Sequence, residues 1–82
     1  MTSERLKLIW DFHGPDAEKT ATHHRFHLIE YAANKKLESP ISDVEKISEQ
    51  HYIAYLVVDR NKMPAVRDAL KPHRGQLYKV TS

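Results

Sequence analysis

Hydrophobic and polar residues alternate along residues 5–13, and Ile9 is the one hydrophobic residue on the polar side. A period of two is typical of a β-strand with one buried face. A second strand is predicted at residues 52–58, where Tyr-Ile-Ala-Tyr-Leu-Val-Val is hydrophobic on both faces, as in the centre of a sheet. The hydrophobic side of the first strand consists of Leu6, Leu8, Trp10 and Phe12.

Hydrophobic residues recur at helical spacing in residues 16–37 and 63–71. Asp16 can cap the first helix, Pro64 is tolerated in the first turn of the second, and Pro72 ends it. The longer helix is hydrophobic on two sides, so we expect it to pack against the sheet and against a second partner. One stripe consists of Ala17, Ala21, His24, Leu28, Tyr31 and Ala32, and the other of Phe26, Ile29, Ala33 and Leu37.

Two weaker strands are predicted at residues 42–48 and 76–80, which gives the order β-α-β-β-α-β in one domain over residues 1–82. The expected fold is α+β and ferredoxin-like: a four-stranded antiparallel sheet with both helices on one face. In that topology residues 5–13 and 52–58 form the central strands, which agrees with their hydrophobic character.

This fold leaves one face of the sheet without helices, and hydrophobic residues are expected there. Ile9 would lie on it. A chain of this size buries only about 60–65% of the surface that its unfolded form exposes, and an open hydrophobic face is unfavourable. We therefore expect a homodimer that pairs through this face. The register leaves two sets of additional residues open, either Ile53, Tyr55 and Val57 or Tyr52, Ala54, Leu56 and Val58.

The composition excludes several classes of function. The chain has no cysteine, which rules out disulfides, thiolate nucleophiles and cysteine-ligated metals. The net charge of +2 is too small to indicate a nucleic-acid or membrane partner. No segment approaches the about 18 hydrophobic residues of a membrane span, and no signal-peptide core follows the N-terminus. We expect a cytoplasmic protein without a cofactor.

Asp11 and His13 form the first candidate site, because residues two apart on a strand share a face. A carboxylate beside an imidazole can orient the ring and raise its basicity, as a general base requires. A tyrosine could complete a ligand pocket where two sheets meet. The candidate pocket residues beside this pair are Ile9, Trp10, Tyr52, Tyr55 and Tyr78.

His23, His24 and His27 form the second candidate site, because spacings of three and four residues bring side chains onto one helix face. Glu30 could add a surface ligand, but no acidic residue lies within the triplet, so the metalloprotease pattern is absent. The alternative is that His24 lies at the edge of the core while His23 and His27 face solvent.

A third group of polar residues is basic and follows the second helix. Cations at a helix C-terminus interact favourably with the helix dipole, which accounts for them without a ligand. A helix C-terminus is also the wrong end for binding an anion. The group consists of Arg67, Lys71, His73 and Arg74.

The Gly14–Pro15 break before the first helix and the Lys-Pro-His-Arg-Gly turn before the last strand extend this layout over the whole chain. In layout and length the chain resembles small uncharacterised bacterial proteins of the ferredoxin-like, dimeric α+β-barrel architecture. That architecture includes cofactor-free monooxygenases, heme-handling enzymes and small-molecule sensors, so the resemblance implies the fold and not the activity.

Three hypotheses follow. The first is a homodimeric domain that binds a small ligand or acts as an accessory protein, with its pocket on the helix-free face. The second is a cofactor-free enzyme with His13 as base and Asp11 as its orienting partner. The third is a divalent-metal protein that uses His23, His24 and His27.

Overall fold

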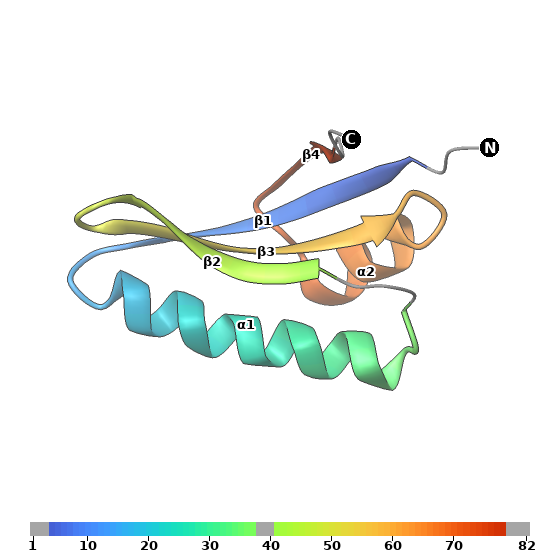
Figure 1. Ribbon diagram of the computed structural model, residues 1–82, viewed down its shortest axis with the longest axis horizontal. Coiled ribbons are helices and arrows are strands. Elements are labelled where there is room, and N and C mark those ends of the chain that lie inside the picture. The colour runs from blue at the N-terminus through green and yellow to red at the C-terminus, as the bar shows by residue number, and fades with distance from the viewer. Residues whose placement is uncertain (1–3, 38–40, 79–82) are drawn as a thin grey trace.

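The computed structural model describes residues 4–37 and 41–78. Four strands form one antiparallel sheet in the order β2-β3-β1-β4, and two helices cover one of its faces (Figure 1). The predicted ferredoxin-like α+β fold is therefore confirmed, with β1 and β3 as the central strands. The elements are β1 (Arg5–His13), α1 (Ala17–Asn34), β2 (Ile41–Ser48), β3 (His51–Asp59), α2 (Met63–Leu70) and β4 (Arg74–Tyr78).

Helix α1 ends three residues before the predicted position. Lys36 adopts a left-handed backbone conformation with φ of 53°. The backbone N–H of Lys36 donates to the carbonyl of Ala33 at 3.2 Å, and that of Leu37 donates to the carbonyl of Ala32 at 3.0 Å. These two bonds form a Schellman motif, which ends the helix although no glycine is present. The predicted stop at residues 38–40 lies outside the described residues.

Strand β4 begins at Arg74, two residues earlier than expected. Its pairing with β1 already starts there, with Arg74 opposite Ile9. Gly75 lies opposite Leu8, whose side chain would be 3.3 Å from a Cβ at this position. The early start is important for the site described below, because it brings Arg74 into the sheet. Residues 79–80 of the predicted strand lie outside the described residues.

The main core lies between the sheet and the helices. Trp10 belongs to it, and its indole Nε1 donates a hydrogen bond of 3.0 Å to the carbonyl of Leu70 at the end of α2. The register places the set Tyr52, Ala54, Leu56 and Val58 toward the helices, which settles the alternative that the sequence left open. The buried members of this core are Leu8, Trp10, Ala21, Leu28, Ala54, Leu56, Val58 and Val66.

The helix-free face of the sheet differs from the expectation of an exposed hydrophobic surface. Ile9, Ile53 and Val57 lie on this face, but each is at most 3% exposed in the single chain. Tyr55 and Arg74 lie on either side of Ile9 in the sheet, and Lys7 extends over the Tyr55 ring with its Nζ 4.2 Å from the centroid. Long side chains thus flank the aliphatic residues, and the face itself is largely polar.

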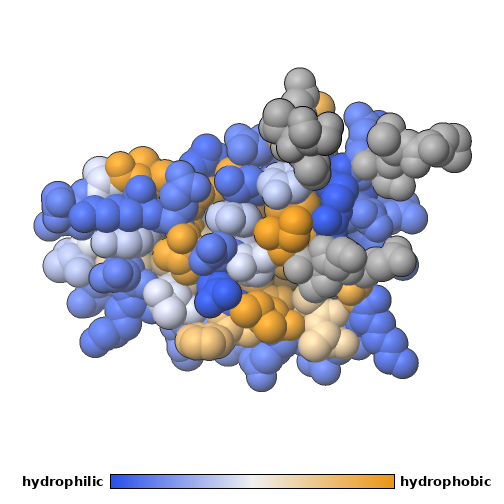
Figure 2. Space-filling view, in the orientation of Figure 1, coloured by the Kyte–Doolittle hydropathy of each residue, from blue (hydrophilic) through white to orange (hydrophobic). Residues whose placement is uncertain are grey.

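The second hydrophobic stripe is only partly covered. Phe26 and Ile29 are exposed on the outside of α1, whereas Leu37, just after the helix, packs against the core. Figure 2 shows hydrophobic residues among hydrophilic ones along α1. Neither helix of the described residues is long and hydrophobic enough to cross a membrane.

Truncation of one core leucine tests this packing. Leu56 is fully buried, whereas Leu77 on β4 is 55% exposed. We expect Leu56→Ala to lower the free energy of unfolding by about 2–5 kcal/mol, because it removes buried methyl groups and leaves a cavity. The matched control Leu77→Ala should cost about 0.5 kcal/mol or less. Urea unfolding monitored by Trp10 fluorescence measures both, and equal losses would contradict the described core.

Candidate functional site

Asp11 joins three strands on the helix-free face. Its Oδ2 accepts a hydrogen bond of 3.0 Å from Nε of Arg74, and its Oδ1 accepts one of 3.1 Å from Nη2 of the same guanidinium. Oδ1 also accepts a hydrogen bond of 2.8 Å from Nε2 of His51. We call these three residues, from β1, β4 and β3, the Asp11 cluster. Bidentate arginine–carboxylate pairs are among the stronger polar contacts in proteins and have a defined geometry.

The strand register explains why these residues meet. His13 lies opposite His51, and Ile9 lies opposite Arg74. Residues two apart on a strand share a face, and diagonal neighbours on adjacent strands are within reach of long side chains. Asp11 lies between Ile9 and His13 on β1, so it is a diagonal neighbour of both His51 and Arg74.

His13 contacts His51 and not the carboxylate of Asp11. The two imidazole rings stack with their centroids 4.1 Å apart and their planes 22° from parallel. His13 is exposed, whereas the side chains of Asp11 and His51 are 17% and 23% exposed. The hydrogen-bond partners of the Asp11 carboxylate are thus His51 and Arg74, and His13 lies next to them by stacking on His51.

His73 fixes the chain just before β4. Its backbone N–H donates to the carbonyl of Ile9 at 2.9 Å, and its Nδ1 accepts a hydrogen bond of 2.8 Å from the backbone N–H of Asp11. An imidazole nitrogen that accepts carries no proton, so the ring proton of His73 lies on Nε2. The backbone of Asp11 is thereby held in place, which helps to orient its side chain toward Arg74.

The basic segment thus has two roles. Arg67 lies in the last turn of α2, where a cation was expected. Arg74 instead enters β4 and pairs with Asp11.

The surroundings of Asp11 favour its charged form. Hydrogen bonds from Arg74 lower the pKa of Asp11 to about 2, the hydrogen bond from His51 adds to this effect, and burial opposes it. The same contact with Asp11 raises the pKa of Arg74. The pair is therefore fully ionised at neutral pH. A strongly shifted carboxylate held by named partners is one mark of a functional site.

The predicted pocket residues do not all lie near this cluster. Trp10 and Tyr52 belong to the helix side of the sheet, because successive strand residues point to opposite faces. Ile9 is on the helix-free face but buried. Tyr55 lies opposite Ile9, one diagonal step from Asp11, whereas Tyr78 lies opposite Arg5 at the other end of β1. Of the candidate tyrosines, Tyr55 is thus the one beside the cluster.

The environment of Tyr55 also disfavours its ionised form. Burial raises the pKa of Tyr55, and the nearby carboxylates of Asp43 and Glu45 raise it further. The phenol is therefore held in its protonated form, in which it can donate a hydrogen bond.

The histidine triplet separates into a pair and a single residue. His23 and His27 lie on the outside of α1 with their Nε2 atoms 3.1 Å apart, and Glu30 is 3.7 Å from Nδ1 of His27. His24 turns toward Trp10, with ring centroids 4.9 Å apart, and burial lowers the pKa of His24. His24 therefore lies at the edge of the core, as the second interpretation of the triplet predicts. Only His23 and His27 of the three lie close enough together to share a ligand.

Within residues 4–37 and 41–78, no three histidine, aspartate or glutamate side chains are grouped so that they could hold a metal ion.

Two residues of the cluster, His51 and Arg74, were not singled out together from the sequence. His51 precedes the strand predicted at residues 52–58, and Arg74 belongs to the group of cations that follows the second helix. The predicted topology already placed β3 and β4 on either side of β1, which was the available signal. The missing information was the register, because shifting the pairing by one residue moves every side chain to the other face.

No protein-family model matches this chain, and no curated protein or solved structure matches it. The functional interpretation therefore depends on the geometry of the chain itself.

Replacement of Asp11 tests the electrostatics of the cluster. The pKa of Asp11 in the folded state lies below the ordinary aspartate value of 3.8, so the carboxylate stabilises the fold above about pH 4. This contribution is lost as the pH falls toward 2. Asp11→Asn should lower the unfolding free energy at pH 7 by about 1–2 kcal/mol, since Arg74 is partly screened by solvent. Between pH 4 and pH 2, the unfolding free energy of Asp11→Asn should also fall less steeply than that of the wild type.

Asp68→Asn is the control, because that side chain is 78% exposed and lies outside the cluster. Chemical denaturation at a series of pH values provides the comparison. Parallel pH profiles for the wild type and Asp11→Asn would show that Asp11 is not held as described.

Proposed function

We propose that the protein is a homodimeric domain that binds a small organic anion at the helix-free face of its sheet. The observation that carries this proposal is the Asp11 cluster, in which three strands hold a carboxylate, a guanidinium and an imidazole in fixed positions. Ligand sites combine a few well-oriented polar groups with nearby hydrophobic surface. Tyr55 and the stem of Lys7 provide that surface beside the cluster.

The hydrogen-bonding capacity of the cluster favours an anionic ligand. Both carboxylate oxygens of Asp11 already accept hydrogen bonds. A guanidinium has five N–H donors, and Asp11 occupies only part of those of Arg74. The exposed ring of His13 adds a further N–H donor. Since unused donors outnumber unused acceptors, a carboxylate or phosphate group is the complementary ligand.

The proposed dimer pairs two helix-free faces. Neither helix of the described residues covers this face (Figure 1). The charged side chains of Arg5 and Asp59 on it are only 17% and 30% exposed, whereas that of Arg74 is 50% exposed. Pairing through this face would bring two Asp11 clusters toward a common two-fold axis. The buried state of Ile9, Ile53 and Val57 means that the dimer would depend on polar contacts and on Tyr55 more than on aliphatic burial.

The absence of cysteine suits a reducing compartment, so we propose a cytoplasmic location for the protein.

The oligomeric state tests the first part of the proposal. Light scattering at micromolar concentration should give twice the chain mass of 9.6 kDa. Tyr55→Arg should give monomers, because it places a second cation beside Lys7 on the proposed interface. The control Phe26→Arg changes an exposed aromatic residue on the outside of α1 and should remain dimeric.

Circular dichroism verifies that both variants remain folded. A monomeric wild type, or a dimer that is lost in Phe26→Arg and retained in Tyr55→Arg, would rule out pairing through the helix-free face.

Nuclear magnetic resonance titration tests the ligand. Inorganic phosphate and benzoate should shift the ring signals of His13 and His51 in a saturable manner. Arg74→Gln should weaken this binding by about tenfold or more, because it removes a charged hydrogen-bond donor. Arg67→Gln is the matched control and should bind as the wild type does. The proposal fails if neither anion shifts these signals, or if both variants bind equally.

A second candidate function uses the same residues for catalysis. The hydrogen bond between Asp11 and His51 orients an imidazole as in a general-base pair, and it leaves Nδ1 of His51 as the nitrogen that could take a proton. His51 thus replaces His13 as the candidate base, and no cofactor is required.

A further inference from the structure

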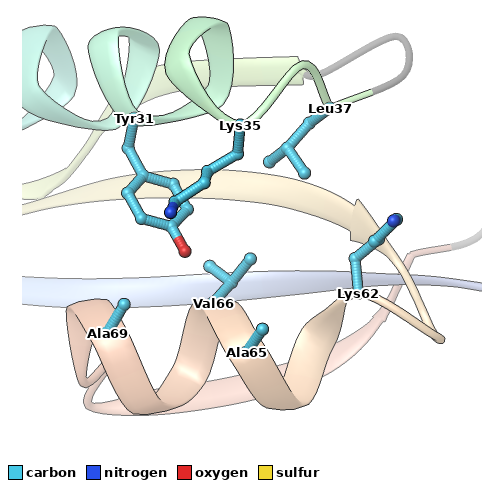
Figure 3. A pocket seen from close by; sticks show the side chains of 7 residues that line it. All are labelled: Tyr31, Lys35, Leu37, Lys62, Ala65, Val66 and Ala69. Atoms are coloured by element: carbon cyan, nitrogen blue, oxygen red, sulfur yellow. The ribbon is translucent and has the colours of Figure 1, made fainter.

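On the other side of the sheet, the C-terminal half of α1 and helix α2 enclose a groove of about 450 Å³ (Figure 3). This volume is within the range of about 300–1,000 Å³ that is typical of small-molecule sites. The groove is separated from the Asp11 cluster by the sheet, so it is a different site from the one in the proposed function.

The groove exists because α2 presents small residues to α1. Ala65 and Ala69 form much of the α2 wall, and their methyl groups do not fill the space between the helices. Buried Val66 lies between them at the base. Tyr31 projects from α1 toward α2, and Leu37 lines the same space (Figure 3). The walls are thus mainly hydrophobic.

Two lysines give the groove its charge. Lys35 follows α1 and Lys62 precedes α2, and both side chains line the groove. The Nζ of Lys35 lies 5.9 Å from the centroid of the Tyr31 ring. No carboxylate among residues 4–37 and 41–78 forms an ion pair with either ammonium group. Each ammonium offers three hydrogen-bond donors and no acceptor.

Hydrophobic walls with two such cations are complementary to one class of ligand. We propose that this groove binds an anionic amphiphile, a carboxylate with a hydrophobic body such as a medium-chain fatty acid. The carboxylate pairs with one of the two lysine ammonium groups, which lie toward opposite ends of the groove (Figure 3), and the hydrophobic body lies over Val66 between Ala65 and Ala69. A strongly hydrophilic anion would leave these walls in contact with water, and a neutral lipid would leave the two cations without a partner.

Calorimetric titration with decanoate tests this inference, with decanol as the neutral probe of equal chain length. The wild type should bind decanoate with one site per chain and at least about tenfold more tightly than decanol. The double variant Lys35→Gln/Lys62→Gln should lose about tenfold or more in decanoate affinity while its weak decanol binding is retained. Lys19→Gln, on the N-terminal half of α1, removes the same charge elsewhere and should bind normally.

Ala69→Leu provides a second test, because it narrows the groove without changing charge, and it should weaken both probes. Equal decanoate binding by the wild type and the double lysine variant, or an absence of binding by the wild type, would overturn the inference. Loss of decanoate binding on raising the protein concentration would show that a second copy occupies the groove, which would also overturn it. In a nuclear magnetic resonance titration with decanoate, the ring signals of Tyr31 report on the groove and those of His13 and His51 report on the Asp11 cluster, so failure of this inference is distinguishable from failure of the proposed function.

Discussion

The nine-residue pairing of β1 with β3 is the constraint on which the rest of the structure depends. It extends from Arg5 opposite Asp59 to His13 opposite His51 without interruption. Because side chains alternate along both strands, this single register determines which residues face the helices and which face away. It places Trp10 and Leu56 in the core, and it places Asp11 beside His51 on the other face. A shift by one residue would bury the charged groups and expose the core.

The two faces of the sheet reach stability by different means. On the helix side, large side chains from the sheet and both helices pack into a hydrophobic core, and the indole of Trp10 ties β1 to the end of α2. On the other side, Ile9, Ile53 and Val57 are buried without a helix above them. Ion pairs and long side chains flank them, with Lys7 close to both Tyr55 and Glu45 and with Arg74 bound to Asp11. Polar contacts on this face thus serve both the fold and the proposed binding site.

Much of the fold could be predicted from the pattern of residues, and less of the site. Alternation in β1, hydrophobic character in β3 and helical spacing in α1 are local signals, and each identified its element. The end of α1 was missed because its Schellman motif uses Lys36 in place of glycine. The Asp11 cluster was found in part, since Asp11 and the helix-free face were recognised. His51 and Arg74 could not be added, because their approach depends on register between distant strands and on the early start of β4 at Arg74. The exposed hydrophobic face that suggested a dimer was inferred from the types of residue expected on it. The residue type does not show how far neighbouring side chains cover Ile9 or Ile53, which are buried in the single chain.

The central claim is that Asp11 is held as a charged anchor between Arg74 and His51. A carboxyl ¹³C titration of Asp11 by nuclear magnetic resonance measures this directly. We expect a pKa of about 2 in the wild type and a return toward the ordinary aspartate value of 3.8 in Arg74→Gln, since the hydrogen bonds from Arg74 are the largest cause of the shift. A wild-type pKa near 3.8, or one that Arg74→Gln leaves unchanged, would contradict the account.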